Sequence, residues 1–122
     1  MITGRELTRE EKENLAKEVR QFLMDNELWT DARIYFNGKA FCSNRGDLED
    51  EDPRAYFEYV SPDDVMSVSF EGDFYGCMNF RCQYGADFDN RIQKEFGDIL
   101  ESYGVYYELG HAWNLTCCYL WK

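Results

Sequence analysis

The residues whose chemistry stands out in this sequence are carboxylates gathered in one short stretch. The window from residue 47 to residue 64 contains one base, Arg54, and eight acids: Asp47, Glu49, Asp50, Glu51, Asp52, Glu58, Asp63 and Asp64. This window therefore carries a net −7 of the chain's formal −11. Runs of like charge are commonly solvated loops that keep a protein soluble, and some are surfaces that a cationic partner holds.

The functional interpretation of these acids is imitation of nucleic acid. Duplex DNA carries one charge per about 1.7 Å of axis, and an extended run of acids approaches that density. Such a segment would compete for an Arg- and Lys-lined groove on another protein. Because the chain has 24 acids against 13 bases, we expect no direct binding to nucleic acid or to an anionic membrane.

A calcium loop is the third interpretation of the same acids. An EF-hand counted from Asp47 needs a glycine at its sixth position and a glutamate at its twelfth. Glu58 meets the second requirement, but Asp52 stands where the glycine belongs. We therefore expect no standard EF-hand, and weak adventitious binding of divalent ions stays an alternative.

The five cysteines indicate reduced thiols in a cytosol. An odd count with two adjacent residues does not fit the disulfide framework of a secreted domain. Only Cys77 and Cys82 approach the spacing of paired zinc ligands, and His111 is the only histidine. We expect no metal and no cofactor, with zinc as the alternative.

Catalysis lacks its usual residues. His111 falls in a predicted hairpin turn, and Cys117 and Cys118 fall in a strand rather than at a helix N-terminus, where thiolates are stabilised. The sequence has no Gly-x-Ser-x-Gly, no phosphate-binding glycine loop and no His-Glu-x-x-His. The expectation is a protein that is not an enzyme.

The first half of the chain predicts one helix and several strands. Thr8 and Glu11 have the spacing of a capping box, and an apolar stripe at helical spacing follows to about residue 25. Asn37-Gly38 between two runs of strand formers predicts a hairpin over residues 33–42. Residues 43–54 are expected to form a polar loop, and residues 55–60 and 65–70 two more strands joined by a turn at Pro62.

The second half predicts a long helix and a hairpin. Residues 72–85 fit a helix or a strand, and a short helix from Asp73 is favoured. A helix near Asp87 should end at Gly104, followed by strands over 105–109 and 113–120. The fold class is α+β: one domain over residues 1–122, with an antiparallel sheet of about five to six strands and two helices on one face.

Aromatic residues suggest other functions. The chain has nine Tyr, nine Phe and three Trp, of which we expect in the core Phe22, Phe36, Phe70, Phe96 and Trp113. Tyr59, Tyr75 and Tyr106 fall on the opposite faces, where exposed tyrosines suit protein interfaces. The alternatives are an adaptor that binds through this aromatic surface, a homodimer joined at a strand edge, and a small-ligand-binding protein.

The chain lacks a bilayer-spanning apolar run, and residues 1–13 lack the apolar core of a signal peptide. We expect a cytoplasmic protein.

Segments of the second half also resemble other proteins. The stretches Val68–Tyr75, Met78-Asn79 and Tyr103–Trp113 resemble small proteins carried by bacterial phages and mobile elements. A small, acidic, cytosolic α+β protein is similar in format to anti-CRISPR and anti-restriction proteins, several families of which mimic DNA. The resemblance implies an inhibitor of a CRISPR effector nuclease in the host cell, and it assigns no role to any single residue.

Overall fold

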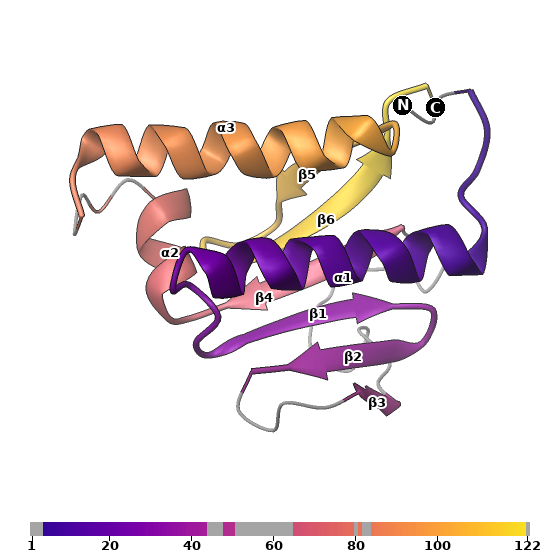
Figure 1. Ribbon diagram of the computed structural model, residues 1–122, viewed down its shortest axis with the longest axis horizontal. Helices are drawn as coiled ribbons and strands as arrows, with labels where there is room; N and C mark the ends of the chain where they lie inside the picture. The colour runs from indigo at the N-terminus through magenta and orange to yellow at the C-terminus, as the bar shows by residue number, and fades with distance from the viewer. Residues whose placement is uncertain (1–3, 44–47, 51–64, 80, 82–83, 122) are drawn as a thin grey trace.

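The computed structural model describes residues 4–43, 48–50, 65–79, 81 and 84–121. These residues form one antiparallel sheet in the order β3-β2-β1-β4-β6-β5, with helices packed on one of its faces (Figure 1). In chain order the elements are α1 (Arg9–Asp25), β1 (Ala32–Phe36), β2 (Lys39–Cys42), β3 (Leu48–Asp50), β4 (Met66–Phe70), α2 (Asp73–Met78), α3 (Ala86–Ser102), β5 (Val105–Leu109) and β6 (Asn114–Tyr119). The predicted α+β class is confirmed.

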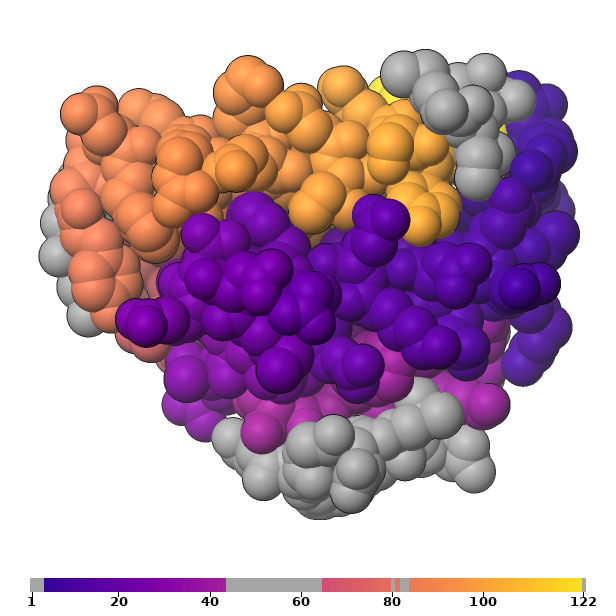
Figure 2. Space-filling model, in the orientation of Figure 1, coloured from indigo at the N-terminus to yellow at the C-terminus, as the bar shows by residue number. Residues whose placement is uncertain are grey.

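Helix α1 begins where the capping box predicts. The Thr8 hydroxyl accepts a hydrogen bond from the Glu11 amide at 3.1 Å, and the Glu11 carboxylate accepts one from the Thr8 amide at 2.9 Å. The apolar stripe then packs on the sheet, and its fully buried members are Leu15, Ala16, Val19 and Leu23. In Figure 2 the side chains of α1 and α3 meet and close over this face of the molecule.

The predicted hairpin of β1 and β2 is confirmed. Asn37 and Gly38 both have positive φ, 51° and 75°, as a type I′ turn requires. Phe36 consequently pairs with Lys39, and the register continues to Arg33 opposite Cys42.

The prediction of a loop over residues 43–54 is wrong in one respect, because Leu48–Asp50 form strand β3. Acidic residues are poor strand formers, so composition indicated a loop. The strand forms although its local propensity is low, because the edge of β2 supplies backbone hydrogen-bond partners. In this pairing Ala40 lies opposite Glu49. The strand predicted at residues 55–60, the turn at Pro62 and Tyr59 lie outside the described residues.

Helix α2 confirms the helical alternative for the segment after Gly72, with a different cap from the one expected. Asp73 is the first helical residue, and its amide donates to the Thr30 hydroxyl at 3.3 Å, so the cap comes from outside the helix. This arrangement brings the two backbones together. A Cβ at Gly72 would lie 2.3 Å from the Thr30 carbonyl oxygen, so only glycine fits.

The last three elements follow the prediction closely. Helix α3 begins at Ala86, and Gly104 follows it with φ +74°, as a C′ glycine should. The final hairpin pairs Val105 with Tyr119 and Leu109 with Leu115. No helix among the described residues is both long and apolar enough to cross a membrane.

The core lies between the sheet and the helices. A chain of aromatic rings crosses it, with centroids 5.1 Å apart from Phe70 to Phe74, 5.4 Å from Phe74 to Phe96 and 5.3 Å from Phe96 to Tyr107. The other face of the sheet carries a smaller buried cluster of Tyr35, Ala40 and Cys42, with Trp113 partly buried against it. Of the expected core aromatics, Phe22 and Trp113 are thus partly buried, and the other three are buried.

Replacing Gly72 tests the close approach of the two backbones. Gly72→Ala should lower the free energy of unfolding by about 1–3 kcal/mol, because the new methyl group overlaps the Thr30 carbonyl. Gly97→Ala in α3 is the matched control, since a Cβ there has no neighbour within 4 Å, and it should raise stability by about 0.5–1 kcal/mol. Urea unfolding measures both, and equal effects would contradict the steric account.

Candidate partner-binding site

Two of the eight acids predicted to bind a partner lie within the described sheet. Glu49 and Asp50 lie in β3, where Glu49 pairs with Ala40 and Asp50 with Lys39 of β2. The other six lie outside the described residues: Asp47, Glu51, Asp52, Glu58, Asp63 and Asp64. The start of the acidic segment is therefore tied by backbone pairing to the β1–β2 hairpin.

Among the described residues, strand β3 is the last strand at one edge of the sheet. The order of strands puts β5 at the other edge, with four strands between them (Figure 1). The position of β3 thus follows from the Asn37-Gly38 turn, which fixes β2, and from the pairing of β2 with β3.

Some acids elsewhere in the described structure form ion pairs with neighbouring bases. In the helices, ion pairs join residues four apart: Glu13 with Lys17 at 3.2 Å, Glu95 with Arg91 at 2.6 Å and Asp98 with Lys94 at 2.8 Å. Such exposed pairs contribute little stability, but they neutralise charge locally. By count, the 47–64 window carries −7 of the formal −11, and it has Arg54 as its single base.

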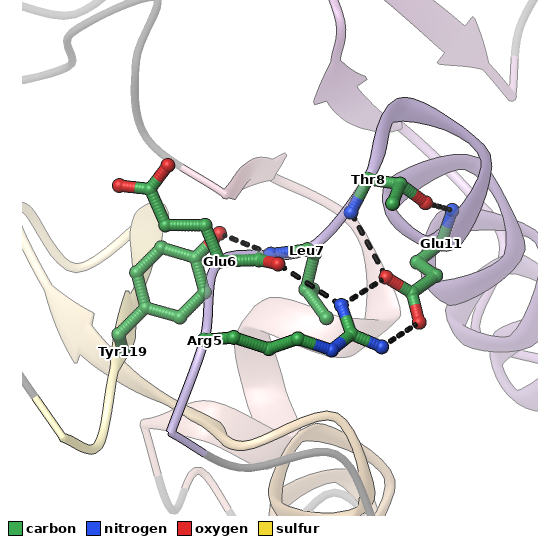
Figure 3. A network of polar contacts seen from close by, with 6 residues as sticks. All are labelled: Arg5, Glu6, Leu7, Thr8, Glu11 and Tyr119. Atoms are coloured by element: carbon green, nitrogen blue, oxygen red, sulfur yellow. Dashed lines mark hydrogen bonds and ion pairs between the residues drawn. The ribbon is translucent and has the colours of Figure 1, made fainter.

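A bidentate ion pair joins the N-terminal segment to α1 (Figure 3). The two guanidinium nitrogens of Arg5 lie 2.7 and 2.8 Å from the two carboxylate oxygens of Glu11. The hydrogen bonds from Arg5, together with the one from the Thr8 amide, lower the pKa of Glu11 to about 2. Beside this pair the Leu7 amide donates to the Tyr119 hydroxyl at 2.8 Å, so the segment is fastened to β6. The Glu11 carboxylate thus has its hydrogen-bond donors within the chain.

A buried acid in α3 is the polar feature that our sequence analysis missed. Asp89 is 1% exposed, and it lies near the Cys77 thiol of α2. Burial raises the pKa of Cys77 to about 11, and the nearby Asp89 carboxylate adds to the rise. Gln93 donates to the Cys77 carbonyl at 2.9 Å, completing a polar contact between α2 and α3. A protonated, buried thiol is a poor nucleophile, so this cluster joins two helices and performs no evident chemistry.

The helical spacing of residues in α3 could have predicted that Asp89 is buried. Asp89 stands three residues before Ile92 and seven before Phe96, so it shares the buried stripe of α3. An acid on such a stripe indicates a buried polar contact.

The residues considered for catalysis do not come together. His111 lies in the hairpin turn as predicted, exposed, with its ring 5.4 Å from the Trp113 ring and nearly parallel to it. Cys117 is buried and packs in the core under the helices, and Cys118, the next residue of the strand, points to the opposite face of the sheet. Across the described ranges, no three residues of the His, Cys, Asp and Glu types are arranged to hold a metal ion.

No family model, curated protein or solved structure matches this chain.

The Arg5–Glu11 pair predicts a shifted titration. In the folded protein the Glu11 carboxyl should titrate near pH 2, and in Arg5→Ala its midpoint should move back toward 4.5. Because the folded pKa lies below the ordinary value, the pair stabilises the fold above about pH 4.5, and this contribution disappears as the pH falls through 2. Carboxyl-carbon NMR measures both midpoints, with Glu10→Gln as a control in the same turn. A wild-type midpoint above 4 would contradict the contact.

The environment of Cys77 predicts that its thiol reacts slowly with alkylating reagents. With a pKa of about 11 against an ordinary 9.0, its thiolate population should be about a hundredfold lower than that of an ordinary cysteine. Iodoacetamide labelling at pH 8, followed by peptide mass spectrometry, should modify Cys77 far more slowly than the partly buried Cys118. Asp89→Asn should speed the labelling, because it removes a negative charge that raises the pKa. Equal rates at the two cysteines would refute this account.

Proposed function

We propose that this protein is a non-enzymatic inhibitor that binds another protein through its acidic segment, residues 47–64. The segment would occupy a cationic groove that otherwise holds nucleic acid, and the class of partner we propose is a CRISPR effector nuclease or a related defence protein in a bacterial cytoplasm. The observation that carries the proposal is the net −7 concentrated in 18 residues of the chain.

Electrostatics supports a binding role over a purely solubilising one. Acids that serve only solubility can be spread over a whole surface, whereas these are confined to one window. Three acids of the described helices, Glu13, Glu95 and Asp98, each pair with a base four residues away, so these three compete weakly for an external cation. A concentrated field of one sign steers and orients a partner of the opposite sign.

The pairing of β3 with β2 gives a second support. A DNA mimic needs its charges held at defined spacings, because a freely moving chain loses conformational entropy when it is ordered on binding. Glu49 and Asp50 belong to a strand whose backbone is held opposite Ala40 and Lys39. The backbone at this start of the segment is therefore preorganised.

Isosteric neutralisation tests the proposal. The triple variant Asp50→Asn, Glu51→Gln, Asp52→Asn should bind the partner at least tenfold more weakly, because it removes three phosphate-like charges. The matched control neutralises three exposed acids on the helices, Glu10→Gln, Asp87→Asn and Glu101→Gln, and should change the affinity less than twofold. Both variants have the same net charge, so only position distinguishes them.

The measurement uses purified effector nucleases and restriction enzymes, each bound to a labelled duplex DNA. The wild-type protein should displace the DNA from its target, and its affinity should fall steeply between 50 and 500 mM salt, as expected for a phosphate competitor. Inhibition that survives the segment variant, or that is insensitive to salt, would refute acidic mimicry. Salt-insensitive binding would favour the aromatic surface instead.

One observation favours that second candidate, an interaction through apolar side chains. Four of the large exposed hydrophobic residues lie on the last hairpin or directly after it: Tyr106, Leu109, Leu120 and Trp121, which are 36%, 46%, 53% and 41% exposed. These side chains offer apolar surface on the C-terminal hairpin, with Tyr106 and Leu109 on opposite faces of β5.

A further inference from the structure

The outer edge of β5 offers backbone groups for a further strand. Leu120 donates to the Gly104 carbonyl at 3.0 Å, and Gly110 donates to the Asn114 carbonyl at 3.2 Å. Antiparallel pairing alternates, so Tyr106 and Glu108 also direct their backbone groups toward β6. Val105, Tyr107 and Leu109 therefore direct theirs away from β6.

Only part of this edge is open. Val105 is fully buried, whereas Tyr107 is partly exposed and Leu109 is 46% exposed. Within the described part of the chain, neither Tyr107 nor Leu109 has a backbone partner on the outer side. An incoming strand could thus pair with both residues, and an edge of this kind is a template for strand addition.

The side chains along the edge differ on the two faces of the sheet. On the face away from the helices, the exposed Glu108 carboxylate accepts a hydrogen bond from the Tyr106 hydroxyl at 2.9 Å. On the helix side, the Tyr107 ring packs on Phe96, and Leu109 leaves apolar surface exposed. An added strand would therefore meet a negative charge on one face and apolar groups on the other.

A second copy of the chain does not satisfy these conditions. If Tyr107 of one copy pairs with Leu109 of the other, the two Glu108 side chains stand directly opposite, and like charges in that position are destabilising. A register centred on Tyr107 avoids this contact but needs the edge of Val105, which is buried. A register centred on Leu109 also avoids it but needs the backbone of His111, whose amide donates to the Asn114 side chain at 2.7 Å. Two molecules that each carry −11 also repel each other.

We propose that the β5 edge binds an extended cationic segment of a partner protein by strand addition. The segment would have a Lys or Arg opposite Glu108, between two apolar residues that pair with Tyr107 and Leu109. β5 and β3 lie at opposite ends of the strand order, so this surface is separate from the acidic segment. The inference therefore does not depend on the function proposed for that segment.

A designed peptide tests strand addition directly. The probe is a fluorescein-labelled Thr-Leu-Lys-Leu-Thr peptide, and its control carries N-methyl groups on both leucines, which removes the ladder donors but keeps the charge. Measured by fluorescence anisotropy, the control should bind at least tenfold more weakly than the probe. Equal affinity of the two peptides, or no binding of the probe at millimolar concentration, would overturn the proposal.

Amide hydrogen exchange locates the contact. In the free protein the Tyr106 and Glu108 amides should exchange slowly, and those of Tyr107 and Leu109 quickly. The probe should slow exchange at Tyr107 and Leu109. Protection that appears only in β2 or β3 would show that the peptide is held by general electrostatic attraction, and would refute the site.

Charge reversal separates this surface from the acidic segment. Glu108→Lys should weaken probe binding about fivefold, and Glu27→Lys, which makes the same change of net charge in the loop after α1, should leave it within twofold. The triple variant of Asp50, Glu51 and Asp52 should bind the probe like the wild type. Equal losses in the Glu27 and Glu108 variants would overturn the proposal, whatever the fate of the acidic segment.

Discussion

The contact of three buried phenylalanine rings holds the layers of this protein together. Phe70 comes from β4, Phe74 from α2 and Phe96 from α3, and each side chain is fully buried. Edge-to-face rings combine a large buried apolar area with a preferred geometry, so they fix the distance and the orientation of the elements that carry them. Phe96 extends the contact to Tyr107, which holds α3 against β5. The contact is centred on the sheet, because β4 lies between the two edges.

The two edges of the described sheet differ in chemistry. At β3 the backbone of Glu49 and Asp50 is held by β2, at the start of a window with a net −7. At β5 a single acid, Glu108, stands among apolar and aromatic neighbours. In our proposals, a partner for the first edge would be selected by long-range attraction and be sensitive to salt, whereas one for the second would be selected by backbone pairing and short-range contacts. The two proposed surfaces are independent of each other.

Sequence reasoning predicted the elements that depend on near neighbours in the chain. The Thr8–Glu11 capping box, the Asn37-Gly38 turn and Gly104 after α3 are each local motifs, and each lies in the structure where the sequence indicated. Sequence reasoning failed where a residue distant in the chain determines the local structure. Strand β3 forms because β2 lies beside it, the cap of α2 comes from Thr30, and Asp89 is buried by its contact with α2. Of the candidate site, the sequence identified the charge, and the structure adds backbone positions for Glu49 and Asp50.

The amino-acid sequence alone determined the fold class, the helix and hairpin boundaries, and the concentration of acid in one window. These properties follow from periodicity, capping and composition, which act over a few residues. Only the tertiary structure decided the order of the strands, and with it which strands became edges. It also decided which backbone groups of β5 point outward, since that depends on the hydrogen bonds with β6. The physical reason is that strand pairing joins residues far apart in the chain, and their choice of partner depends on how the whole core packs.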